Sequence, residues 1–122
     1  MQRLEQAVVG LEQALSSIPQ LPDSWCPLVR QRLARVRDAL AAESTQATET
    51  WLSARAGHLH RERIRLLSRI AALGGLINTN ANALDDTVRE NLLRLVHDIQ
   101  HHHQRVNDLA YDSVAMEVGG SE

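Results

Sequence analysis

The sequence predicts an all-α protein: an antiparallel helical bundle, or a coiled-coil-like hairpin, of three to four helices in one domain covering residues 1–122. Apolar residues recur at alternating steps of about four and three near the C-terminal end, the pattern of a helix that packs along its length against other helices. Phenylalanine is absent, and the aromatic residues are two tryptophans and one tyrosine. The core must therefore be built from Leu, Ile, Val and Ala, and a chain of 122 residues has room for one modest core.

The first helix is expected over residues 3–17, because one stripe of apolar residues runs along it while its acidic residues fall elsewhere. A proline-rich linker is expected over residues 18–27, in which Asp23 and Ser24 offer N-terminal caps for the next helix. The stripe consists of Leu4, Val8, Leu11, Leu15 and Ile18, and the linker prolines are Pro19, Pro22 and Pro27.

A long helical segment is expected over residues 28–77, although its apolar stripe changes direction at Gly57 by about 100°. Either the helix breaks near Ala56–Gly57 or one continuous helix changes its packing partner there, and the sequence leaves both open. The stripe before Gly57 is Val29, Leu33, Val36, Leu40, Ala47, Trp51 and Ala54, and the stripe after it is Leu59, Leu66, Ile70, Leu73 and Ile77.

The last helix is expected over residues 84–117, after a turn region that Gly74–Gly75 and the asparagines of residues 78–82 provide. An aspartate at position 85 or 86 can cap its start, and Gly119–Gly120 provide its stop. Its apolar seam is Val88, Leu92, Leu95, Ile99, Val106, Leu109 and Met116, with His102 at one core position.

A histidine within an apolar seam indicates a polar layer that sets the register of the helices, or alternatively a pH sensor. Asp98 lies one turn before His102 and could hydrogen-bond its ring. If the imidazole is buried and neutral, acidification should loosen the bundle. If Asp98 holds it as a cation, stability should fall as the pH rises through its titration.

Two further histidines, His97 and His101, are weak candidates for metal ligands, because residues four apart lie on one helical face. Both fall on the outward side of the seam, and no motif predicts additional ligands. The Glu-x-x-His pattern of di-iron bundles is missing, since Arg94 and Gln100 occupy the positions where a glutamate would stand. We therefore expect no cofactor and no physiological metal site.

Composition argues against several classes of function. Every basic residue is an arginine and the net charge is -2, so a broad nucleic-acid-binding surface is not expected. No apolar stretch approaches the roughly 20 residues that cross a bilayer, and no classical secretion signal stands at the N-terminus. The single cysteine, Cys26, excludes an internal disulfide and favours the cytoplasm. No phosphate loop, nucleophile elbow or paired nucleophile and base is found, so no enzymatic activity is expected.

From Leu33 to Met116 the pattern resembles the FlgN-type flagellar export chaperones. The resemblance implies a small bacterial helical chaperone that holds a hook-filament junction subunit through an amphipathic part of its last helix. The proline-rich break at residues 19–27 departs from the family pattern. The resemblance is carried by Ala39-Leu40, Trp51-Leu52, Arg55, Leu59, Arg63 with Leu66-Leu67 and Leu73-Gly74, and by Gln104, Asn107, Leu109 and Ala110.

The expected function is that of a non-enzymatic helical module that binds a protein client or a second copy of itself. The last helix is about twice as long as the first, so part of its apolar seam should outrun its partners within the chain and need another surface. Two alternatives stay open: a small helical sensor or metal-responsive bundle that uses His97, His101 and His102, and a structural homodimerisation module. The candidate partner-binding residues are Val106, Leu109, Ala110, Val114, Met116 and Val118.

Overall fold

The computed structural model describes residues 2–16, 25–43, 50–79 and 86–120, and these residues form four α-helices without a strand. This confirms the predicted all-α fold class. The helices are α1 (Gln2–Ser16), α2 (Trp25–Ala41), α3 (Thr50–Thr79) and α4 (Asp86–Gly120). None of the described helices has an apolar stretch long enough to cross a membrane.

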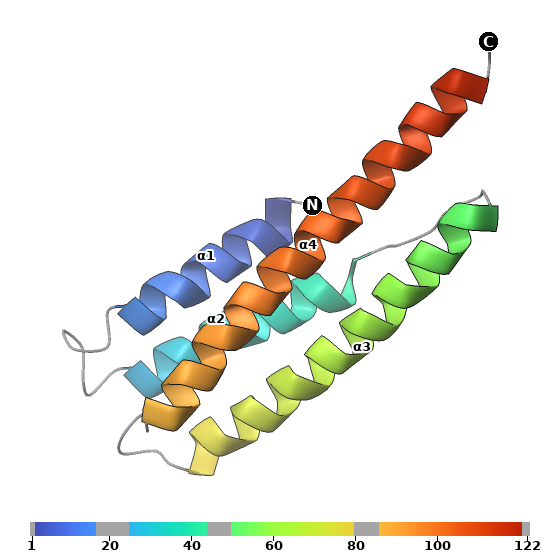
Figure 1. Ribbon diagram of the computed structural model, residues 1–122. Coiled ribbons are helices and arrows are strands. Elements are labelled where there is room, and N and C mark those ends of the chain that lie inside the picture. The colour runs from blue at the N-terminus through green and yellow to red at the C-terminus, as the bar shows by residue number, and fades with distance from the viewer. Residues whose placement is uncertain (1, 17–24, 44–49, 80–85, 121–122) are drawn as a thin grey trace.

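Successive helices run in opposite directions, and α1 and α2 lie beside only part of the length of α3 and α4 (Figure 1). Helix α1 packs against α2 and α4, while α3 packs against α2 and α4. The molecule is therefore a four-helix bundle at one end. At the other end α3 and α4 continue as a helix pair, which we call the α3–α4 extension (Figure 1).

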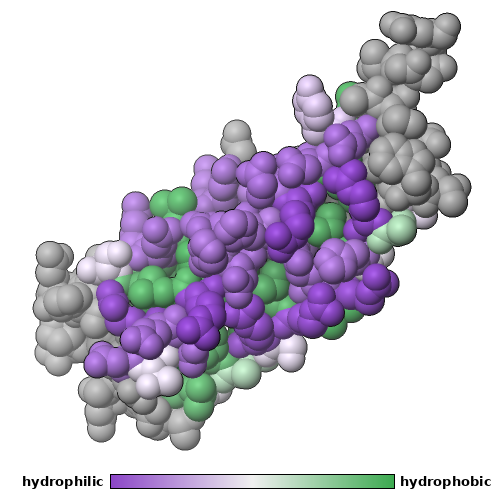
Figure 2. Space-filling model, viewed as in Figure 1, coloured by the Kyte–Doolittle hydropathy of each residue, from purple (hydrophilic) through white to green (hydrophobic). Residues whose placement is uncertain are grey.

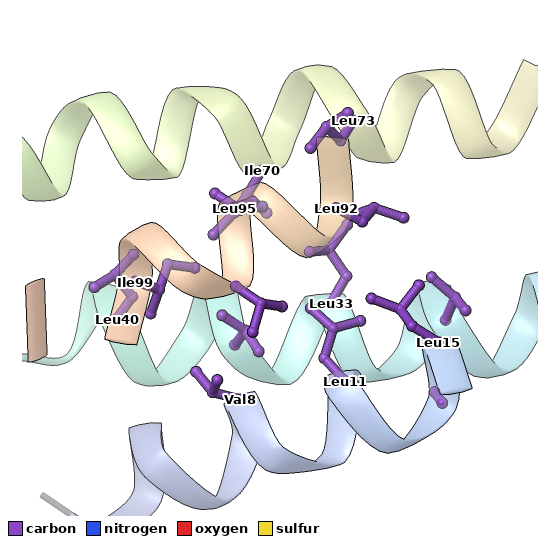
Figure 3. Close-up of a cluster of buried hydrophobic side chains, with 14 of the residues drawn as sticks. Val8, Leu11, Leu15, Leu33, Leu40, Ile70, Leu73, Leu92, Leu95 and Ile99 are labelled. Carbon is purple, nitrogen blue, oxygen red and sulfur yellow. The ribbon is translucent and has the colours of Figure 1, made fainter. Parts of the chain in front are cut away.

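The main core fills the four-helix part of the molecule. Figure 3 shows side chains from all four helices pointing into this shared interior. Most of the described polar residues lie outside this core, and the described surface in Figure 2 is largely hydrophilic with smaller apolar areas between. The large apolar side chains with almost no exposed surface are Leu11, Leu15, Val29, Val36, Leu40, Ile77, Leu92, Leu95 and Ile99.

A second, smaller group of buried apolar residues lies in the α3–α4 extension. This distal cluster consists of Ala56, Leu59, Val106 and Leu109, which are 2–8% exposed. It is separate from the main core, which has members from all four helices.

The expected helical segment 28–77 is two helices, and the break lies before Gly57. Helix α2 ends at Ala41, where Ala42 and Glu43 donate backbone hydrogen bonds to Asp38 and Leu40. Helix α3 begins at Thr50 and contains Gly57 in its interior. Residues 41–50 offer few large apolar side chains to bury, whereas one glycine inside a helix costs only about 1 kcal/mol. The break at Ala56–Gly57, one of the two possibilities left open, is therefore wrong.

The other predicted boundaries also shift. The linker prediction extended to Pro27, but α2 begins at Trp25. Proline is tolerated in the first turn of a helix, because its missing N–H would have no helical partner there. Residues 17–24 and 80–85 lie outside the described residues. Helix α4 runs to Gly120, three residues past the predicted end at 117.

The turn predicted at Gly74–Gly75 is also wrong, because both glycines lie inside α3. No glycine among the described residues has a positive φ. A Cβ atom at Gly74 would lie 3.9 Å from Leu33, and a Cβ at Gly75 would meet no atom within 4 Å. Neither glycine is therefore required by backbone geometry or by close packing.

Replacing Gly75 by alanine is expected to raise the free energy of unfolding by about 0.5–1 kcal/mol, because alanine loses less conformational entropy in a helix. Urea denaturation followed by circular dichroism measures the change. Gly75→Pro serves as the opposite control and should destabilise the protein by about 3 kcal/mol or more. If Gly75→Ala were destabilising, a continuous helix through this position would be contradicted.

Candidate functional site around His102

His102 occupies the boundary between the main core and the distal cluster. On α4 it follows Ile99 of the main core and precedes Val106 of the distal cluster. Its side chain is 0% exposed, and it is the only polar residue among the fully buried large side chains that the structure describes. The predicted polar position within the apolar seam is therefore buried.

Both ring nitrogens of His102 face carboxylates. Nδ1 lies 2.6 Å from Oε1 of Glu62 on α3, and Nε2 lies 2.6 Å from Oε1 of Glu43, just past the end of α2. An imidazole donates from both nitrogens only when it is protonated. Burial alone would lower the pKa of His102, but the hydrogen bonds and charges of Glu43 and Glu62 outweigh it and raise that pKa above its ordinary value. The arrangement therefore holds His102 as a cation.

Each of the two carboxylates also has an arginine neighbour. Arg105 donates to both oxygens of Glu62 at 2.8 and 3.3 Å, and the His58 ring lies 3.9 Å from the same carboxylate. Burial raises the pKa of Glu62, but the hydrogen bonds from Arg105 and His102 exceed this effect and leave the pKa below its ordinary value. Arg63 donates to the backbone carbonyl of Glu43 at 2.6 Å and lies 3.9 Å from its side chain.

The predicted partner of His102 was wrong. Asp98 accepts a hydrogen bond from Nη1 of Arg69 on α3 at 2.7 Å, and both side chains are about 39% exposed. The carboxylates that do contact His102 come from positions 40 and 59 residues away along the chain. The sequence left open whether His102 is neutral or cationic, and the geometry favours the cation. The residues that hold it are Glu43 and Glu62 instead of Asp98.

The His102 network is suited to joining helices. Its hydrogen bonds connect the residue after the end of α2 with α3 and α4, at the boundary between the four-helix part and the α3–α4 extension. Both imidazole nitrogens are engaged and the ring has no exposed surface, so in this arrangement His102 offers neither a base nor a metal ligand to a substrate.

His97 and His101 lie on the exposed side of α4, with their Nε2 atoms 3.1 Å apart and their rings in an edge-to-face arrangement. No group of three or more possible ligands is placed to hold a metal ion among the described residues. The Cys26 thiol is buried and lies 3.7 Å from the carbonyl oxygen of Ile77, which makes it a packing residue of the main core.

The predicted partner-binding residues divide into covered and exposed groups. Val106 and Leu109 are 4% and 2% exposed, because α3 covers them in the distal cluster. Ala110 and Val114 are exposed, and the side chains of Met116 and Val118 lie outside the described residues. Tyr111, which is 75% exposed, was not among the predicted residues, because it falls outside the seam pattern.

No protein-family model, curated protein or solved structure matches this chain.

Proposed function

We propose that the protein is a non-enzymatic helical module that binds a protein partner through the C-terminal part of α4. The observation that carries this proposal is an exposed apolar surface on α4, formed by Ala110, Tyr111 and Val114, which we call the α4 end surface. Tyr111 is 75% exposed and Val114 is 61% exposed. This part of α4 extends beyond α1 and α2 (Figure 1).

The spacing of these residues supports one continuous contact surface. Residues three and four apart are neighbours on a helix, so Val114 adjoins both Ala110 and Tyr111. Tyrosine combines a large apolar body with a hydroxyl group and is enriched in protein interfaces. An ion pair between Arg55 and Asp112, 2.7 Å long, ties this part of α4 to α3. A partner helix laid along the α4 end surface would cover the exposed apolar area.

The finer proposal names the client. Resemblance to the FlgN-type chaperones supports a hook-filament junction subunit as the client, and this identification rests on the resemblance alone. Its test is calorimetric titration of the purified junction subunit into the protein, in which saturable binding is expected. Absence of binding would contradict the identification of the junction subunit as the client. It would not contradict the general proposal that the protein binds a protein partner.

Site-specific photo-crosslinking in living cells tests the general proposal. A photo-crosslinking amino acid at position 111 or 114 is expected to capture one defined protein. The same amino acid at Ile64, which is 53% exposed on α3, should not capture it. Val114→Asp is expected to weaken the purified complex by about tenfold or more, because it places a charge in an apolar contact.

Other outcomes would replace the proposal. Capture of a second copy of this chain from positions 111 and 114, together with a dimer in light scattering, would indicate the structural homodimerisation module. A large rise in melting temperature with zinc or nickel that His97→Ala abolishes would indicate the metal-responsive alternative. Equal capture from position 64 would contradict a surface specific to the end of α4.

A further inference from the structure

Three arginines line a hollow of about 400 Å³ between α1 and α2. Arg3 contributes from α1, and Arg32 and Arg35 contribute from α2. Asp38 is the carboxylate in the lining. The volume lies within the range of about 300–1,000 Å³ typical of small-molecule sites.

The three guanidinium groups carry unpaired charge. Among the described residues, none of them forms a hydrogen bond or an ion pair. Asp38 is engaged instead by Arg37, which does not line the hollow, at 3.2 Å. The Nε atom of Arg32 is buried and has no hydrogen-bond partner. A buried donor without a partner costs free energy.

The hollow between α3 and α4 gives a useful contrast. It has a similar volume, about 380 Å³, and is also lined by three arginines. There, however, Arg69 is bound by Asp98 and Arg105 is bound by Glu62. Excess positive charge is therefore greater in the hollow between α1 and α2.

The side chain of Arg32 lies close to Gly10 of α1. A Cβ atom at Gly10 would lie 3.4 Å from Nη1 and 3.5 Å from Cδ of Arg32. The guanidinium group therefore lies close to the backbone of α1. Arg32 also lines the hollow, so this guanidinium group lies where α1 and α2 meet.

We propose that this hollow is a binding site for the dianionic phosphate group of a small phosphorylated molecule. The three guanidinium groups and the carboxylate of Asp38 give the lining a net charge of two positive units. A phosphate monoester near neutral pH, with almost two negative charges, balances this better than a ligand with one carboxylate group does. Guanidinium groups bind phosphate oxygens through paired N–H donors. The site lies on α1 and α2 and is independent of the α4 end surface.

Calorimetric titration at about pH 7.5, where a phosphate monoester is mostly dianionic, tests the proposal. The probes are inorganic phosphate and glycerol 3-phosphate, with ionic strength held constant by sodium chloride. Saturable binding to the wild-type protein is expected. Arg32→Gln and Arg35→Gln should each weaken it by about tenfold, since each removes a charge-assisted hydrogen bond. In NMR spectra the Nε–H resonance of Arg32 should shift with each probe.

Arg30→Gln is the matched control, because it removes the same charge from the same helix, lies outside the hollow and contacts Cys26 rather than a lining residue, and it should leave the affinity within about twofold. Circular dichroism verifies that all variants are folded. The proposal would be overturned by an equal loss of binding in Arg30→Gln, by an absence of saturable binding at millimolar probe, or by a phosphoserine peptide that binds while glycerol 3-phosphate does not. None of these results depends on binding at the end of α4.

Discussion

Replacing His102 by leucine is expected to lower the free energy of unfolding by about 3 kcal/mol, because breaking a buried ion pair leaves charge without compensation. His102 is 0% exposed, and a carboxylate oxygen lies 2.6 Å from each ring nitrogen. Glu43 and Glu62 would keep Arg63 and Arg105 as neighbours, so the loss should be smaller than for wholly unpaired carboxylates. Urea denaturation near pH 6 measures the difference.

The same network predicts the pH dependence of stability. The pKa of His102 is raised in the folded protein, so its stabilising contribution is fully present below the unfolded pKa of about 6.5 and is lost as the pH rises through the higher folded value. The pKa of Glu62 is lowered, so its contribution is present above the unfolded value and is lost as the pH falls through the lower folded value. Arg63 and Arg105 are the charged neighbours of the two carboxylates.

The pH prediction is measured as the difference in unfolding free energy between the wild-type protein and His102→Leu from about pH 5 to 9. This difference isolates His102 from the other histidines and should shrink toward alkaline pH. His101→Leu is the matched control, because it removes an exposed histidine from the same helix and should cost under about 0.5 kcal/mol. A difference that stays constant with pH, or that grows on the alkaline side, would contradict a cationic His102.

Glu43→Gln combined with His102→Leu separates charge from packing. If the penalty of His102→Leu comes from uncompensated carboxylates, the double variant should be more stable than the sum of the single losses predicts. A coupling of about 1–2 kcal/mol is expected for residues in direct contact. Strict additivity would mean that the 2.6 Å contact between Glu43 and His102 contributes little to stability.

The core was predictable from the sequence because a spacing of three and four residues alone places side chains on one face of a helix. Leu4, Leu33 and Leu92 illustrate this: each belongs to a predicted stripe and each is buried. Helix ends were less predictable. Gly57 and Gly74–Gly75 lie inside α3 because the surrounding apolar residues stabilise the helix by packing, which outweighs the weak helix preference of glycine.

The partners of His102 could not be read from the sequence. Periodicity shows which face of its own helix a residue occupies, but it does not show which residues of other helices lie nearby. Glu62 approaches His102 from α3, and Glu43 approaches it from the end of α2. Asp98 was the natural local candidate, since it lies one turn away on the same helix. The three-dimensional packing instead directs Asp98 toward Arg69. The one feature of the sequence that pointed to a partner on α3 was Glu62, which is the single acidic residue of that helix beside five arginines.

Replacing Leu95 by alanine is expected to cost about 4 kcal/mol of global stability, because it removes a buried side chain and leaves a cavity. Leu95 is 0% exposed and lies in the main core, to which all four helices contribute (Figure 3). A loss of this size is a large part of the total stability of a small domain, which is about 5–15 kcal/mol. Urea denaturation of Leu95→Ala, with exposed Leu76→Ala as the control, measures it.

Leu109→Ala should behave differently, because the distal cluster contains four buried residues from two helices and is separated from the main core by the His102 network. We expect a smaller cost of about 2 kcal/mol, expressed as local opening of the α3–α4 extension. Native-state hydrogen exchange distinguishes the two cases. Leu109→Ala should accelerate exchange at residues 53–60 and 103–112 and leave residues 92–99 protected, whereas Leu95→Ala should accelerate exchange throughout all four helices. Uniform acceleration in Leu109→Ala would show that the His102 network couples the two clusters into one cooperative unit.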